Sequence, residues 1–140
     1  VGTSHFVHRA MRARKMVGGG MRQSGVLAAA GLYALEHTVP RLSEDHARAA
    51  RLAVGLAAID GIEVGPVETN LVYFALDADV MAAGPFAEAM EARGVRLLGA
   101  YHSTSGSAQT MRAVVHFQLD DDDIDHTVVA AREVLASRPL

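Results

Sequence analysis

The segment LVYFAL, residues 71–76, is a compact apolar run with the length of a buried β-strand. Shorter strand signals lie on both sides of it. Ile62 and Val64 alternate with polar residues, residues 95–98 form another short strand, and residues 111–117 alternate between two distinct faces. The sequence therefore predicts four short strands.

Helical patterns surround these strands. Ser4 can cap a first helix, which Gly18-Gly19-Gly20 would end because glycine is costly in a helix interior. Thr38 and Pro40 are typical of a cap and a first turn. The later helices are expected at residues 21–37, 38–59, 85–93 and 121–137.

The order of elements indicates the fold class. Three helices precede strand, strand, helix, strand, strand and helix, with a loop rich in Gly, Ser and Thr expected over residues 99–109. This order predicts an α/β chain of the α+β kind. Its small, mostly antiparallel sheet would be covered by helices on one face.

Composition excludes several classes of protein. The 140 residues carry a net charge of −3, so the chain as a whole has no general attraction to nucleic acid. The absence of cysteine excludes disulfides, zinc ribbons and thiol nucleophiles. No stretch approaches the roughly 18 apolar residues of a membrane span. We expect a cytoplasmic protein that acts without a membrane.

The phrase RKMVGGGMRQ, residues 14–23, places two cations beside a triple glycine that would open a helix. Free backbone N–H groups at a helix start attract anions. Arg22 would lie in the first turn of that helix, where a cation opposes the helix dipole, so a phosphate or carboxylate could explain it. The alternative is a flexible hinge with solvated arginines.

Arg112 lies on the strand face opposite Met111, Ala113, Val115 and Phe117. A guanidinium can bind a carboxylate through two parallel hydrogen bonds. Arg112 is therefore a candidate for binding a carboxylate, and the alternative is an ion pair with a nearby acid.

Other polar residues are expected to be structural. His46 falls on an apolar helix face and suits a partly buried structural histidine, whereas His116 shares the strand face of Arg112 and could border a site. The acidic run at residues 120–123 lacks the spacing of a calcium loop, and acids at a helix start favour the helix dipole.

Four phrases together carry a family resemblance. The sequence resembles low-specificity L-threonine aldolases in RKMVGGGMRQSGVLAAAGLYAL (14–35), RLSEDHARAARLA (41–53), ETNLVYF (68–74) and MRAVVHFQL (111–119). The triple-glycine phrase is fairly specific to this family, and the other phrases agree with it in order and spacing. The resemblance covers nearly the whole chain and is weakest over residues 77–109.

The resemblance implies an enzyme that depends on pyridoxal 5′-phosphate (PLP) and has the aspartate-aminotransferase type of fold. Residues 1–38 would be connecting helices after a large PLP-binding domain, and residues 39–140 would form the carboxy-terminal small domain. The Schiff-base lysine would lie before the position that matches Val1, so this chain would supply no catalytic residue. Lys15 is its only lysine and matches a different basic residue near the active site.

The resemblance also implies roles for three cations. Arg112 matches the arginine that binds the α-carboxylate, Lys15 matches a basic residue on the substrate side, and Arg22 matches an arginine at the PLP phosphate. The substrate would be threonine or a related β-hydroxy amino acid, cleaved to glycine and an aldehyde by a homodimer or homotetramer. The isolated chain would be inactive.

Two alternatives remain open at this point. The chain could be the small domain of another PLP lyase or aminotransferase of the same fold type. It could also be a non-catalytic interaction module.

Overall fold

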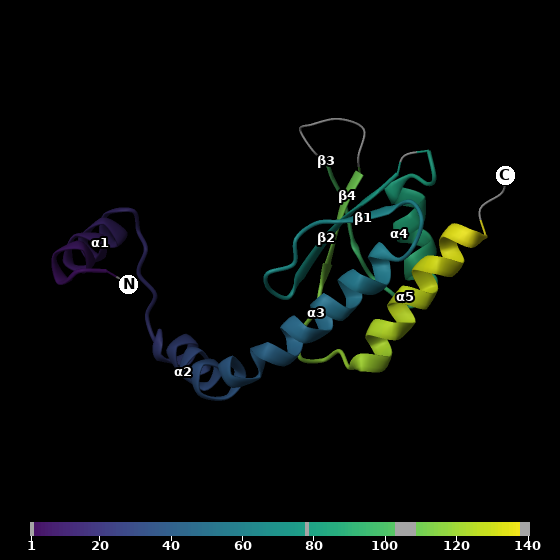
Figure 1. Ribbon diagram of the computed structural model, residues 1–140. Helices are drawn as coiled ribbons and strands as arrows, with labels where there is room; N and C mark the ends of the chain where they lie inside the picture. The colour runs from purple at the N-terminus through teal and green to yellow at the C-terminus, as the bar shows by residue number, and fades with distance from the viewer. Residues whose placement is uncertain (1, 78, 103–108, 138–140) are drawn as a thin grey trace. The chain divides into compact units, whose positions relative to one another are not determined.

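A computed structural model describes residues 2–77, 79–102 and 109–137, without the side chains of residues 99–102 and 109 (Figure 1). The chain divides into two compact units, residues 1–40 and residues 41–140. The predicted loop at residues 99–109 lies in part outside the described residues. Its two ends belong to strands.

The first unit is helical. Helix α1 (Ser4–Met16) is capped by Thr3, whose side chain accepts a 3.3 Å hydrogen bond from the Phe6 amide, and not by Ser4 as predicted. The second helix was expected from residue 21, but α2 (Gly25–Tyr33) begins four residues later. It is followed by a π-helical turn (Ala34–Thr38) and a 3₁₀ turn (Val39–Arg41). Thr38 and Pro40 therefore lie before the third helix instead of opening it.

The second unit combines a sheet with helices, as predicted. Its four antiparallel strands have the order β1-β2-β4-β3. The elements are α3 (Leu42–Ala57), β1 (Ile62–Val64), β2 (Leu71–Leu76), α4 (Ala83–Glu91), β3 (Leu98–His102), β4 (Gln109–Val114) and α5 (Asp121–Ala136). Strand β3 starts where the predicted strand 95–98 was expected to end, because only Leu98 of that run pairs with β4.

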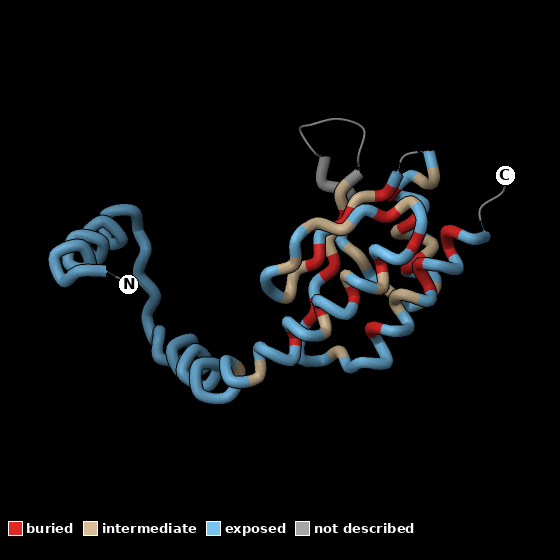
Figure 2. The backbone as a smooth tube through the Cα atoms, in the orientation of Figure 1, coloured by how far each residue is buried: buried red, intermediate tan, exposed pale blue. Residues whose placement is uncertain are grey.

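The helices cover one face of the sheet. Helix α3 packs on β1 and β2, α4 packs on β3 and β4, and α5 contacts both helices (Figure 1). Along β2, Val72, Phe74 and Leu76 are buried toward the helices, while Tyr73 is on the other face. The Phe74 ring meets the edge of Phe86 on α4. Figure 2 shows the buried residues gathered in this second unit.

Helices α3 and α5 approach each other closely. A Cβ atom at Gly55 of α3 would overlap the side chain of Val128 on α5, so this contact requires glycine. The buried positions of α3 are Asp45, Ala49, Leu52 and Leu56. His46 is exposed, so its prediction as a partly buried histidine is wrong. The buried stripe runs through the neighbouring Asp45 instead, which pairs with Arg41 at 3.3 Å.

Candidate functional site

Arg112 lies on the face of the sheet that the helices leave uncovered. Its neighbours Met111 and Ala113 are buried on the helix side, and Arg112, between them on β4, is half-buried on the opposite side. The predicted alternation is therefore confirmed along β4, which ends at Val114, and the next residue, Val115, is buried as predicted. Phe117 lies beyond the strand and is exposed, so it is not part of the inner face.

The side chains around Arg112 are mainly apolar or aromatic. Arg112 pairs with Tyr73 on β2 and with Leu98 on β3. Tyr73 is 40%, Leu98 49% and Val114 38% exposed. Arg112 itself is half-buried, and its guanidinium can bind a carboxylate through charge-assisted hydrogen bonds. The uncovered face can thus present a cation suited to a carboxylate.

The triple glycine ends α1 and does not open α2. Gly18 has a φ of +79°, and the amides of Gly18 and Gly19 donate to the carbonyls of Lys15 (3.2 Å) and Arg14 (2.8 Å). This is the Schellman pattern of a helix end. The Gly20 amide donates to the Gly18 carbonyl at 2.9 Å. The prediction that free glycine N–H groups cradle an anion is therefore wrong, because the turn uses all three.

Lys15 and Arg22 border this glycine turn on either side. A Cβ atom at Gly20 would lie 3.8 Å from the Lys15 ammonium nitrogen, so the ammonium group lies beside the turn. Arg22 is exposed and lies three residues before α2. The prediction that it occupies the first helical turn is wrong, and so it does not oppose a helix dipole there. Any anion here would be held by side chains and not by glycine amides.

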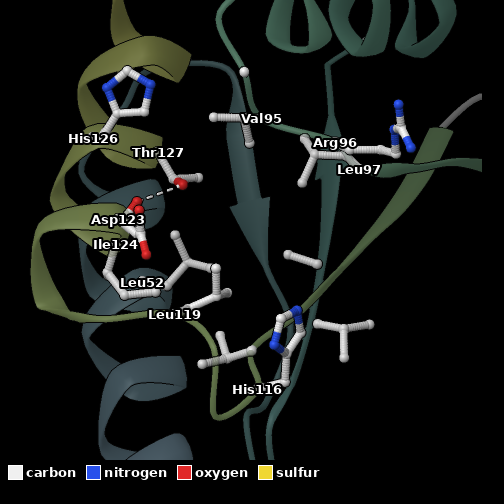
Figure 3. A pocket seen from close by; sticks show the side chains of 14 residues that line it. Leu52, Val95, Arg96, Leu97, His116, Leu119, Asp123, Ile124, His126 and Thr127 are labelled. Atoms are coloured by element: carbon white, nitrogen blue, oxygen red, sulfur yellow. Dashed lines mark hydrogen bonds between the residues drawn. The ribbon is translucent and has the colours of Figure 1, made fainter.

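A cavity of about 290 Å³ lies in the second unit (Figure 3). It is lined by residues of α3, β4, α5 and the segment before β3, including the core residues Leu52 and Ile124. His116 lines it too, but it lies two residues after the end of β4 and so does not belong to the strand that carries Arg112. His126 belongs to the same lining and is 2.9 Å from the Arg93 carbonyl oxygen through Nε2.

The acidic run has a structural role. Asp120 and Asp123 form a reciprocal capping box at the start of α5, as each side chain accepts from the other's amide at 3.0 Å. Asp121 accepts a 2.8 Å hydrogen bond from Arg48 of α3, and this bond raises the pKa of Arg48. In the part of the chain that the structure describes, no group of three or more His, Asp or Glu side chains could hold a metal ion.

Comparison with known proteins identifies the family. The model of the beta-eliminating lyase family matches residues 1–79. The chain belongs to the beta-eliminating lyase family. It is 38% identical over 136 residues to the low-specificity L-threonine aldolase of Escherichia coli K12 and 35% identical over 138 residues to low-specificity L-threonine aldolase 1 of Arabidopsis thaliana. These alignments cover 97% and 96% of the chain and confirm the resemblance.

This beta-eliminating lyase chain spans 38% and 37% of the lengths of those two relatives. Among solved structures, it resembles an aminotransferase from Streptoalloteichus hindustanus over 70% of its length, with a TM-score of 0.55 and 22% identity. It resembles a decarboxylase from Sulfurospirillum multivorans over 63%, with a TM-score of 0.54 and 17% identity. At these identities the likeness shows the fold alone. None of the described helices is long and apolar enough to cross a membrane.

One residue on the uncovered face was not singled out from the sequence. Tyr73 lies within the apolar run 71–76 and looks like one more core residue by composition. The alternation of a strand already places it opposite Val72 and Phe74, and that signal could have found it. The structure adds that its partner across the sheet is Arg112.

Proposed function

We propose that this chain is the carboxy-terminal part of a PLP-dependent threonine aldolase, which cleaves threonine and related β-hydroxy amino acids to glycine and an aldehyde. The observation that carries the proposal is the alignment of nearly the whole chain with low-specificity L-threonine aldolases. Residues 1–38 connect to a large cofactor-binding domain, and residues 39–140 form the small domain. The complete protein is a cytoplasmic homodimer or homotetramer.

Arg112 binds the α-carboxylate of the amino acid in this proposal. Its position on the uncovered face supports this role, because a bound substrate would meet the guanidinium from the side where no helix of the unit packs. Two parallel hydrogen bonds would fix the carboxylate. They would thereby set the orientation of the substrate's Cα–Cβ bond, and positioning of this kind contributes a large part of catalysis.

The described residues fit a supporting role toward PLP. Lys15 beside the glycine turn and the exposed Arg22 supply positive charge suited to the phosphate. Arg22 contacts that phosphate and Lys15 lies on the substrate side. PLP, when bound, accepts the electrons released as the Cα–Cβ bond breaks. The lysine that anchors PLP lies in a preceding part of the longer protein, and Lys15 does not take its place.

The first experiment measures cleavage of threonine by the longer protein that contains this chain. Replacing Arg112 by Ala removes a charge pair worth about 2–5 kcal/mol, so we expect kcat/KM for threonine to fall about 30-fold or more. Arg132→Ala is the matched control, because Arg132 is an exposed arginine on α5, and it should keep the activity. Equal activities of the two variants, or no cleavage by the unmodified protein, would contradict the proposal.

The second experiment tests the assignment of Lys15. Borohydride reduction of the PLP-loaded longer protein, followed by peptide mapping, should place the cofactor on a lysine outside this chain. The 140-residue chain alone should give no stable adduct. An adduct on Lys15 in a protein that turns over threonine would overturn the assignment.

A further inference from the structure

Tyr73 and Arg112 face each other across strands β2 and β4. The Tyr73 carbonyl accepts a hydrogen bond from the Gly65 amide at 2.9 Å, whereas the Asn70 carbonyl accepts one from the Val115 amide of the segment after β4, also at 2.9 Å. The N–H and C=O groups of one strand residue point to the same side. The N–H and C=O groups of Tyr73 therefore both point toward β1 and away from β4. Tyr73 and Arg112 thus form a non-hydrogen-bonded pair of the antiparallel ladder.

Pairs of this kind bring side chains close together. Their Cα atoms are about 4.5 Å apart, compared with about 5.5 Å in hydrogen-bonded pairs. Both side chains emerge on the uncovered face, and Tyr73 is 40% exposed. The phenol of Tyr73 and the guanidinium of Arg112 therefore project from directly paired positions on this face. The partner of Arg112 on the other side, Leu98, has no side-chain group that can donate a hydrogen bond.

The other residues of β2 on this face do not offer the same chemistry. Leu71 and Ala75 flank Tyr73 on the uncovered side, and both are apolar. Thr110 carries a hydroxyl on β4, but its direct partner is Ala75 and its side chain is short. A tyrosine projects its hydroxyl farther and orders only two side-chain torsions in doing so.

We propose that the Tyr73 hydroxyl is a second hydrogen-bond donor to the carboxylate that Arg112 binds, so that the two residues together select amino acids with a free α-carboxylate. This inference rests on the proposed function of Arg112. The guanidinium supplies the charge and two donors, and the hydroxyl supplies a third donor from the neighbouring strand. Tyr73 is a specificity-determining residue in this proposal. It donates a hydrogen bond and takes part in no proton transfer.

The test compares two ligands that differ only at the carboxylate. The dissociation constants of glycine and of glycine methyl ester are measured by calorimetry on the longer, PLP-loaded protein that contains this chain. Tyr73→Phe removes only the hydroxyl. Because a hydrogen bond to a charged group contributes about 1.5–3 kcal/mol, we expect glycine to bind roughly 10-fold weaker or worse. The methyl ester should bind as before.

Tyr33→Phe is the matched control, since it makes the same change on α2, outside the sheet. It should bind both ligands like the unmodified protein. With threonine as substrate, Tyr73→Phe should raise KM and leave kcat within about threefold, because the two hydrogen bonds of Arg112 still orient the substrate and the lost hydroxyl contact binds substrate and transition state alike. A merely structural role would weaken both ligands equally.

The outcomes separate this inference from the proposed function. If Arg112→Lys weakens glycine binding and Tyr73→Phe does not, the role of Tyr73 is wrong while that of Arg112 stands. If Tyr73→Phe weakens glycine and its ester to the same extent, the inference is overturned as well. If neither variant affects glycine and threonine is not cleaved, both proposals fail.

Discussion

The two compact units use their apolar residues in opposite ways. In residues 41–140, strands and helices bury a common core that includes Phe74, Phe86 and Leu56. In the described part of residues 2–40, no residue is buried, and Phe6 and Leu32 are each 60% exposed. Helix α2 is almost entirely apolar (GVLAAAGLY), although all of it is exposed.

This difference shows where each unit obtains its stability. A helix that is apolar on every side is normally a buried helix, and large exposed apolar surfaces mark contacts with other protein. We expect the first unit to be covered by parts of a longer polypeptide or by a second subunit, in line with the greater length of the relatives. The second unit has a core of its own. Two pairs of matched changes test this contrast, and a third experiment tests the ion pairs within the second unit.

The largest effect is expected from Phe86→Ala. Phe86 is completely buried, so its loss should lower the free energy of unfolding by about 3–5 kcal/mol, as measured by urea denaturation of the 140-residue chain. The matched change Phe6→Ala, at a residue that is 60% exposed, should cost less than about 0.5 kcal/mol. Similar losses in the two variants would contradict the contrast between the units.

A smaller effect is expected from Gly55→Ala. The added methyl group would meet Val128, and overpacking of this kind costs about 1–3 kcal/mol. The further change Val128→Ala should restore part of the loss. In α2, a Cβ atom at Gly31 meets nothing within 4 Å, so Gly31→Ala should raise helicity in circular dichroism, with a gain of up to about 1 kcal/mol. A stabilising Gly55→Ala would show that α3 and α5 are farther apart.

The smallest effect is expected from the ion pairs between α3 and α5. Arg51 pairs with Asp125, and both side chains are about half exposed, so Arg51→Ala should cost less than about 1 kcal/mol. The loss should vanish in about 1 M salt, because salt screens exposed charges. The contribution of the nearby pair of Arg48 and Asp121 to stability should also fall with added salt. It should not change with pH near neutrality, because the hydrogen bond to Asp121 raises the already high pKa of Arg48. If the loss of unfolding free energy in Arg51→Ala persists in high salt, packing by the aliphatic part of the arginine side chain is the cause instead.

Local patterns predicted much of the fold. Strands β1 and β2 occupy the residues at which alternation and the apolar run LVYFAL placed them, and α5 begins at Asp121, next to its acidic cap. The predictions of these elements are correct because side-chain periodicity and helix capping depend on residues that are close together in the sequence.

Long-range pairing explains the wrong predictions. Val95 and Leu97 flank Arg96 in the alternation that is typical of a strand, but pairing with β4 begins at Leu98. His46 has helical spacing with apolar residues of α3, yet the buried side of the helix includes Asp45 and not His46. Asp45 can be buried because it pairs with Arg41. At Gly18 the sequence predicted a helix break correctly. It did not predict that the glycine amides would donate their hydrogen bonds to carbonyl groups of the same turn.

In the candidate site, too, one residue could be found from the local sequence pattern and the other only from the tertiary structure. Alternation along residues 111–117 was sufficient to set Arg112 apart from the core, because neighbouring side chains of a strand point to opposite faces. That Tyr73 is its partner follows from tertiary structure alone. The register between β2 and β4 depends on backbone hydrogen bonds between segments far apart in the chain, and a shift of one residue would have turned the opposite face toward the helices.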